Sequence, residues 1–217
     1  MALALFDLDN TLLAGDSDYL WAEFLVEHQL VDGQYYQQMN EHFYQQYLTG
    51  TMDVFEFLAF QLKPLADNSL VDLHRWRDQY LAEKIDAIIL PAAKKLIAQH
   101  QQQGDTLLII SATNNFITSP IAEKLAVPNL IATEAEMING AYTGKVIGIP
   151  SYQQGKVARL YDWLAAQQHT LKGSYFYSDS HNDLPLLNVV DHPVAVDPDA
   201  KLRAIAEQRD WKIISLR

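Results

Sequence analysis

The sequence predicts an α/β fold, a three-layer doubly wound parallel sheet with a helical cap inserted after the first strand. Two observations carry this prediction. The 217-residue chain opens on the short apolar run Met1–Phe6, which ends abruptly at acidic residues. Strand and helix patterns alternate after Leu90, whereas residues 16–86 show helical spacing without a clear strand pattern. Alternating strands and helices are typical of a parallel sheet covered by helices on both faces.

The opening run suits a strand that is buried on both faces of such a sheet, with Asp7 at its carboxyl end. From Ser17 to Ile85, Tyr, Trp, Phe and Leu recur at helical spacing. Four helices are predicted, at Tyr19–Leu30, Gln34–Leu48, Val54–Leu62 and Leu70–Ile85, with breaks at Gly33, Gly50 and Lys63–Pro64. We therefore expect a four-helix cap at 16–86 on an α/β core formed by 1–15 and 87–217.

The second part of the chain supplies the rest of the core. A helix from Pro91 to Gln103, closed by Gly104, precedes a strand from Thr106 to Ile110 that ends at Ser111. The later predicted elements are a helix near Ser119–Leu125, a strand Asn129–Ala132, a hairpin around Asn139–Gly140, a helix Gln154–His169, and strands Ser174–Tyr177, Val194–Val196 and Lys212–Ser215.

The composition argues against several classes of function. The net charge is −11 and no basic cluster is present, so nucleic acid and anionic membranes are poor partners. Cysteine is absent, which excludes disulfides, thiolate metal sites and a Cys nucleophile, and fits a reducing compartment. No apolar stretch approaches the roughly 20 residues of a membrane-spanning helix. The opening run lacks a preceding positive segment and is broken at Asp7, so we expect a cytoplasmic protein.

Polar clusters follow three of the predicted strands, and a lysine opens a helix. They are Asp7-Leu8-Asp9-Asn10-Thr11, Ser111-Ala112-Thr113, Asp179-Ser180-His181-Asn182-Asp183 and Lys156. Ligands of open parallel sheets collect beyond the carboxyl ends of the strands. Several carboxylates there would repel one another unless a divalent cation lay among them. The pattern therefore predicts phosphoryl transfer with Mg²⁺, in which Ser111 donates to a phosphate oxygen and Lys156 adds a positive charge.

Asp7 and Asp9 leave the first strand two residues apart and can point to the same side. One carboxylate can attack phosphorus while the other protonates the departing alcohol and later takes a proton from water. The general acid must stay protonated near neutral pH. We therefore expect a raised pKa for Asp9, which its position away from the metal charge permits.

On these motifs, the chain resembles the haloacid dehalogenase-like hydrolase superfamily, in its phosphoserine-phosphatase-like branch, over essentially its full length. The four motifs of that superfamily match Asp7-x-Asp9-x-Thr11, Ser111, Lys156 and Asp179-x-x-x-Asp183, in the same order.

The resemblance implies a role for each matched residue. Asp7 would be the nucleophile and Asp9 the acid/base. Mg²⁺ would be held by Asp7, the backbone carbonyl of Asp9 and Asp179, with Asp183 bound directly or supporting another ligand. The insertion at 16–86 would be a cap that excludes water and selects the leaving group.

Within that branch, the chain is similar to proteins assigned as histidinol-phosphatases, through Phe6–Asp18 and Ser111–Asn114. Phosphoserine phosphatases usually carry Glu at the position of Asp16 and Ser-Gly-Gly at the position of Ser111-Ala112-Thr113, which disfavours phosphoserine. Asp16 either pairs with a substrate ammonium, such as that of histidinol phosphate, or caps the first insertion helix. Asp18 is assigned a capping role.

Several alternatives stay open from sequence. The enzyme could be a phosphoserine phosphatase, or could transfer phosphate to an alcohol. A signalling receiver module also has a phosphorylatable Asp, but on a middle strand and without an insertion of this size. His181 is interpreted as a loop residue, and the insertion aromatics are interpreted as the insertion's own core, namely Trp21, Tyr44, Phe57 and Trp76. The oligomeric state is not predicted.

Overall fold

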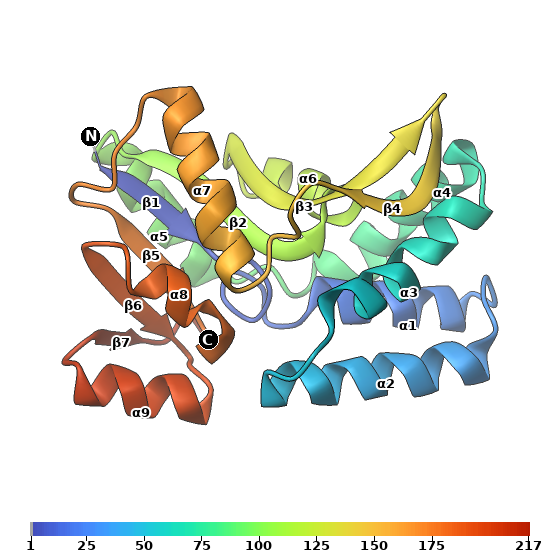
Figure 1. The fold of residues 1–217 in the computed structure, drawn as a ribbon, viewed down its shortest axis with the longest axis horizontal. Coiled ribbons are helices and arrows are strands. Elements are labelled where there is room, and N and C mark those ends of the chain that lie inside the picture. The colour runs from blue at the N-terminus through green and yellow to red at the C-terminus, as the bar shows by residue number, and fades with distance from the viewer. Residues whose placement is uncertain (1) are drawn as a thin grey trace.

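A computed structural model describes residues 2–217 and contains one seven-stranded sheet, drawn in Figure 1. The strand order is β4-β3-β2-β1-β5-β6-β7. Neighbouring strands in the order β3-β2-β1-β5-β6-β7 are parallel, and β4 at one edge is antiparallel to β3. The mostly parallel sheet confirms the predicted α/β class.

The strands begin close to where the sequence predicts them. Their bounds are β1 Leu3–Phe6, β2 Thr106–Asn114, β3 Asn129–Ile138, β4 Ala141–Ile147, β5 Tyr175–Ser178, β6 His192–Val196 and β7 Lys212–Ile214. All four residues of β1 are fully buried, because β2 and β5 pair with it on either side. Asp7 therefore directly follows the central strand of the sheet. The predicted hairpin is confirmed, since Ile138 pairs with Ala141 across Asn139–Gly140.

Helices cover both faces of the sheet. Their bounds are α1 Ser17–Glu27, α2 Gly33–Thr49, α3 Val54–Asp67, α4 Leu70–Tyr80, the π-helical turn η1 Leu81–Ile85, α5 Pro91–Gln102, α6 Asn115–Lys124, α7 Gln154–Gln167, the 3₁₀ turn η2 His181–Asp183, α8 Leu184–Leu187 and α9 Ala200–Gln208. Leu3 and Leu5 pack with α7, α8 and α9, whereas Ala4 and Phe6 pack with α5 and α6. Within residues 2–217, no helix is both long and apolar enough to cross a membrane.

The segment from α1 to η1 forms a helical insertion between β1 and α5, on the side toward which β1 points (Figure 1). Side-chain oxygens cap the first turns of its four α-helices, and they belong to Asp16, Asp32, Asp53 and Ser69. Helices α1 and α4 share a hydrophobic cluster with the sheet, through residues such as Trp21 and Tyr80. Helices α2 and α3 form a separate aromatic cluster of Tyr36, Phe43 and Phe60.

Three predicted boundaries are wrong. Helix α3 continues through Lys63–Pro64 to Asp67, because Pro64 and Leu65 are buried and tertiary packing outweighs the lost backbone hydrogen bond. Strand β2 runs past Ile110 to Asn114, with an irregular register at its end. Helix α6 begins directly after that strand and therefore four residues before Ser119.

Gly155, in the first turn of α7, is required by a close backbone approach. A Cβ atom at this position would lie 2.0 Å from the carbonyl oxygen of Pro150. We expect Gly155→Ala to lower the free energy of unfolding by about 2 kcal/mol, because backbone atoms must move apart. Gly33→Ala is the control, since its Cβ would meet only Val26 at 3.4 Å. Urea denaturation checks this, and equal midpoints for the two variants would contradict it.

Candidate active site

Lys156, near the start of α7, joins two carboxylates at the carboxyl edge of the sheet. Its Nζ lies 2.8 Å from Asp7 Oδ1 and 2.8 Å from Asp183 Oδ2. All three side chains are at least nine-tenths buried. Burial alone lowers the pKa of Lys156, but the charges of Asp183 and Asp7 raise it overall. Lys156 is therefore a fixed positive charge that holds both carboxylates in place.

Asp7 combines burial with one strong cationic partner. Its backbone N–H donates to the Tyr177 carbonyl at 2.9 Å, which fixes the residue beside β5. Burial raises the pKa of Asp7 to about 7, with a smaller rise from the charge of Asp183, while Lys156 acts in the opposite direction. Lys156 is thus the group that favours the ionised, nucleophilic form of this carboxylate.

Asp9 is held by hydrogen bonds without a cation. Its Oδ1 accepts from the Ser17 backbone N–H at 2.6 Å, and its Oδ2 accepts from Thr113 Oγ1 at 2.9 Å. Burial and the charge of Asp16 raise the pKa of Asp9 to about 6, against the lowering effect of the Ser17 and Thr113 hydrogen bonds. The raised pKa expected for Asp9 is therefore confirmed, and burial is its main cause. Burial is thus the main cause of the raised pKa of both carboxylates, which differ in their partners, an ammonium for Asp7 and uncharged donors for Asp9.

Ser111 and Thr113 lie on the last part of β2, next to Asp9. The Ser111 Oγ accepts from the Thr113 backbone N–H at 3.1 Å and lies 3.4 Å from Asp9 Oδ2. Sequence reasoning assigned Ser111 to the site but gave Thr113 no role. The spacing of two residues along an extended strand was the available indication, because it places both side chains on one side.

Thr11 links Asp7 to Asp179. Its Oγ1 donates to Asp179 Oδ1 at 3.1 Å, accepts from the Asp179 backbone N–H at 3.1 Å, and lies 3.4 Å from Asp7 Oδ2. Burial, followed by the charges of Asp7 and Asp183, raises the pKa of Asp179 well above its usual range. Ser178, which had no predicted role, donates to Asp183 Oδ2 at 2.7 Å.

The cluster of Asp7, Asp179 and Asp183 fits Mg²⁺ in its chemistry and charge. Buried Asp7 and Asp183 share the single ammonium of Lys156, and partly buried Asp179 adjoins Asp7 through Thr11. Hard oxygen ligands such as these carboxylates are those that Mg²⁺ prefers. Across residues 2–217, no three His, Cys, Asp or Glu side chains are already arranged around one metal position. The cluster therefore fits Mg²⁺ through its carboxylate oxygens, which are suitable ligands, and through its excess of negative charge.

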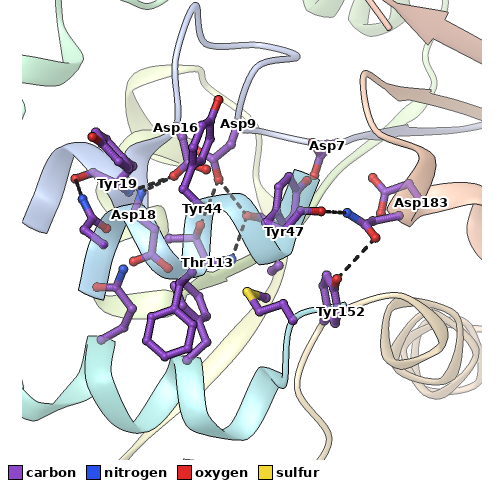
Figure 2. A pocket seen from close by; sticks show the side chains of 18 of the residues that line it. Asp7, Asp9, Asp16, Asp18, Tyr19, Tyr44, Tyr47, Thr113, Tyr152 and Asp183 are labelled. Atoms are coloured by element: carbon purple, nitrogen blue, oxygen red, sulfur yellow. Dashed lines mark hydrogen bonds between the residues drawn. The ribbon is translucent and has the colours of Figure 1, made fainter. Parts of the chain in front are cut away.

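A cavity lies between this cluster and the helical insertion (Figure 2). At the sheet end it is lined by Asp7, Asp9, Ser111, Lys156 and Asp183. Five aromatic side chains of the insertion also line it, those of Tyr19, Phe43, Tyr44, Tyr47 and Phe57, and Tyr152 from the loop before α7 adds a sixth. Tyr44 and Phe57 were interpreted as core residues of the insertion, but both line this cavity. Trp21 is fully buried, as expected of a core residue.

The remaining predicted residues lie around this cavity. Asp16 lines it, and its Oδ1 also caps α1 by accepting from the backbone N–H groups of Asp18 and Tyr19, each at 2.9 Å. Asp179 lines a neighbouring hollow instead. His181 is engaged by Asp199, whose Oδ2 lies 2.8 Å from its Nδ1, in agreement with a loop residue outside the reacting centre.

Comparisons with known proteins agree with this geometry. The family model of the haloacid dehalogenase-like hydrolases matches residues 4–188. A histidinol-phosphatase of Neisseria meningitidis is 43% identical over 99% of both chains. A crystal structure of a protein of unknown function from Bordetella pertussis is 40% identical, with a TM-score of 0.94 over 100% of this chain and 99% of that one. A phospho-aspartyl intermediate analogue of phosphoserine phosphatase shares the fold, with a TM-score of 0.72 at 16% identity over 100% and 93%. The predicted resemblance is confirmed.

The buried ion pairs of Lys156 should contribute strongly to stability. We expect Lys156→Met to lower the free energy of unfolding by about 3–5 kcal/mol in a metal-free buffer, because two buried carboxylates lose their counter-charge. Lys63→Met is the matched control, since the Lys63–Asp67 pair is more than half exposed on both sides. That variant should lose less than about 1 kcal/mol. Urea denaturation measures both, and similar losses would contradict the interpretation of Lys156.

Proposed function

The chain belongs to the haloacid dehalogenase-like hydrolase family, and we propose that it hydrolyses histidinol phosphate with Mg²⁺ through an aspartyl-phosphate on Asp7. Its relatives make it a phosphoric monoester hydrolase, a phosphatase. One observation carries the finer proposal. Asp7 is paired with an ammonium while Asp9, two residues on, is partly buried and accepts only from uncharged donors. That difference suits a nucleophile and a general acid.

The first half of the proposed reaction uses Asp7. Its carboxylate oxygen attacks phosphorus in line, and the bond from phosphorus to the alcohol oxygen breaks. Lys156 favours the ionised form of Asp7 and fixes its direction. The Ser111 hydroxyl, at the end of β2, donates to a phosphoryl oxygen. The protonated carboxyl of Asp9 gives its proton to the departing alcohol oxygen.

The second half returns the enzyme to its starting state. Asp9, now ionised, takes a proton from water, and the water oxygen attacks the phosphorus of the aspartyl-phosphate. The bond from phosphorus to Asp7 breaks, which releases inorganic phosphate and restores both carboxyl groups. Asp7, the Asp9 carbonyl and Asp179, with Asp183 beside them, would hold Mg²⁺, which when bound would supply positive charge against the phosphoryl oxygens. In this proposal residues 16–86 are the cap, on a core of 1–15 and 87–217.

The substrate proposal rests on the cavity lining. Six aromatic side chains suit a flat ring such as imidazole, and the acidic lining suits a positively charged alcohol. The relative named histidinol-phosphatase supports the same choice. Among the described residues that line the cavity, Lys156 is the one lysine or arginine, and it is already paired with Asp7 and Asp183. A substrate carboxylate such as that of phosphoserine would therefore lack a cationic partner.

Replacing the proposed nucleophile tests the mechanism. We expect Asp7→Asn to lower kcat by at least about 10⁴-fold, because the amide cannot form the covalent intermediate. Asp78→Asn, on the exposed surface of α4, is the control and should keep wild-type activity within about twofold. Phosphate release with histidinol phosphate and Mg²⁺ measures both. Substantial turnover by Asp7→Asn would exclude Asp7 as the nucleophile.

A substrate comparison tests the specificity. With Mg²⁺ present, kcat/KM for histidinol phosphate should exceed that for phosphoserine by at least about tenfold, and a chelator should abolish activity with both until Mg²⁺ is restored. Added alcohols distinguish transfer from hydrolysis, because transfer would replace free phosphate by a new ester. A preference for phosphoserine, or full activity in the chelator, would contradict the proposal.

A further inference from the structure

Asp18 is a buried carboxylate in the cavity that the proposed mechanism does not use. It lies in the first turn of α1, is 4% exposed and lines the cavity. Its Oδ1 is buried, and no hydrogen-bond partner for it exists among residues 2–217. The capping role predicted for Asp18 is filled by Asp16, whose Oδ1 accepts the two backbone N–H groups. The Oδ1 atom of Asp18 is therefore an unsatisfied acceptor on a residue that lines the cavity.

Gln61, from α3, presents the complementary feature. It is 3% exposed, lines the same cavity, and its Nε2 is buried without a partner in the described chain. Buried polar atoms are hydrogen-bonded in the great majority of cases, because an unsatisfied one keeps its full desolvation cost. Asp18 Oδ1 and Gln61 Nε2 come from different helices and line one cavity, and neither has a partner in the described chain. We infer that a ligand supplies both partners, a donor for Asp18 and an acceptor for Gln61.

The charge balance indicates that the ligand group beside Asp18 is a cation. Burial, followed by the charges of Asp16 and Asp9, raises the pKa of Asp18 well above its usual range, because no basic group of the described chain offsets them. A ligand cation beside Asp18 would favour its ionised form. The lysine of the cavity, Lys156, is bound to Asp7 and Asp183 instead. Figure 2 shows Asp18 on the side of Asp16 and Tyr19 and well apart from Asp183.

We propose that Asp18 and Gln61 form the leaving-group subsite of this enzyme, which binds a phosphate ester whose alcohol carries a protonated amine and a hydrogen-bond acceptor. Asp18 accepts from the ammonium, and Gln61 donates to the acceptor, for which a ring nitrogen is suitable. Aromatic side chains from the insertion, such as Tyr44 and Phe57, line the remaining space against a flat group. The inference rests on the proposed function, since it assigns the alcohol of that reaction to these side chains.

Kinetics with two esters test the subsite. Asp18→Asn should raise KM for histidinol phosphate on the order of ten- to a hundredfold, because a charge-assisted hydrogen bond is lost. The same variant should hydrolyse p-nitrophenyl phosphate, which has no amine, within about twofold of wild type. Asp78→Asn should change neither value. Equal effects of Asp18→Asn on both esters, or no effect on either, would overturn the assignment.

Calorimetric binding of the free amino alcohol, histidinol, separates this inference from the proposed reaction. Wild-type enzyme should bind histidinol at least about tenfold more tightly than the same imidazole alcohol without its amine, a comparison that needs no variant. Asp18→Asn should remove that difference, and Gln61→Leu should weaken binding of both alcohols. Equal binding of the two alcohols by wild type would refute the subsite. If no ester were hydrolysed but histidinol still bound through Asp18, the reaction alone would be wrong.

Discussion

The buried ammonium of Lys156, held between Asp7 and Asp183, is the interaction on which the rest of the site depends. It ties the end of the central strand β1 to the start of α7 and to η2, three segments that are distant in sequence. Burying any one of these charges alone would be costly, whereas together they balance in part. The direction of Asp7, the proposed nucleophile, is consequently set by the fold itself. The remaining negative charge of Asp179 and its neighbours is of the kind that a divalent cation would balance.

Asp7 and Asp9, for which different tasks are proposed, differ mainly in their partners. Burial is the largest cause of the raised pKa of each. Their partners differ, because Asp7 meets an ammonium and Asp9 meets hydroxyl and amide hydrogens. The insertion also supplies Asp18, from α1, to the cavity. The proposed chemistry and the proposed choice of alcohol therefore share one cavity.

Much of the site could be predicted because its residues lie at strand ends in a parallel sheet, where chain order fixes spatial proximity. Asp7, Ser111 and Lys156 converge as expected from that rule. Properties that depend on side-chain convergence were not predictable. Asp16 and Asp18 are the same residue type two positions apart and both line the cavity. Only the structure shows that Asp16 caps α1 while Asp18 Oδ1 has no partner in the described chain. The break predicted at Lys63–Pro64 was wrong for a similar reason, since burial decided the length of α3.

The most direct test of the covalent role of Asp7 is to locate the phosphoryl group on the protein during turnover. Enzyme mixed with histidinol phosphate and Mg²⁺, quenched in acid within a single turnover and digested, can be mapped by mass spectrometry. A phosphoryl group on the side chain of Asp7 is predicted, because the Lys156 ion pair favours the ionised form of this carboxylate and fixes its direction. A phosphoryl group on Asp9, or rapid turnover with no protein-bound phosphoryl group at any time, would contradict it.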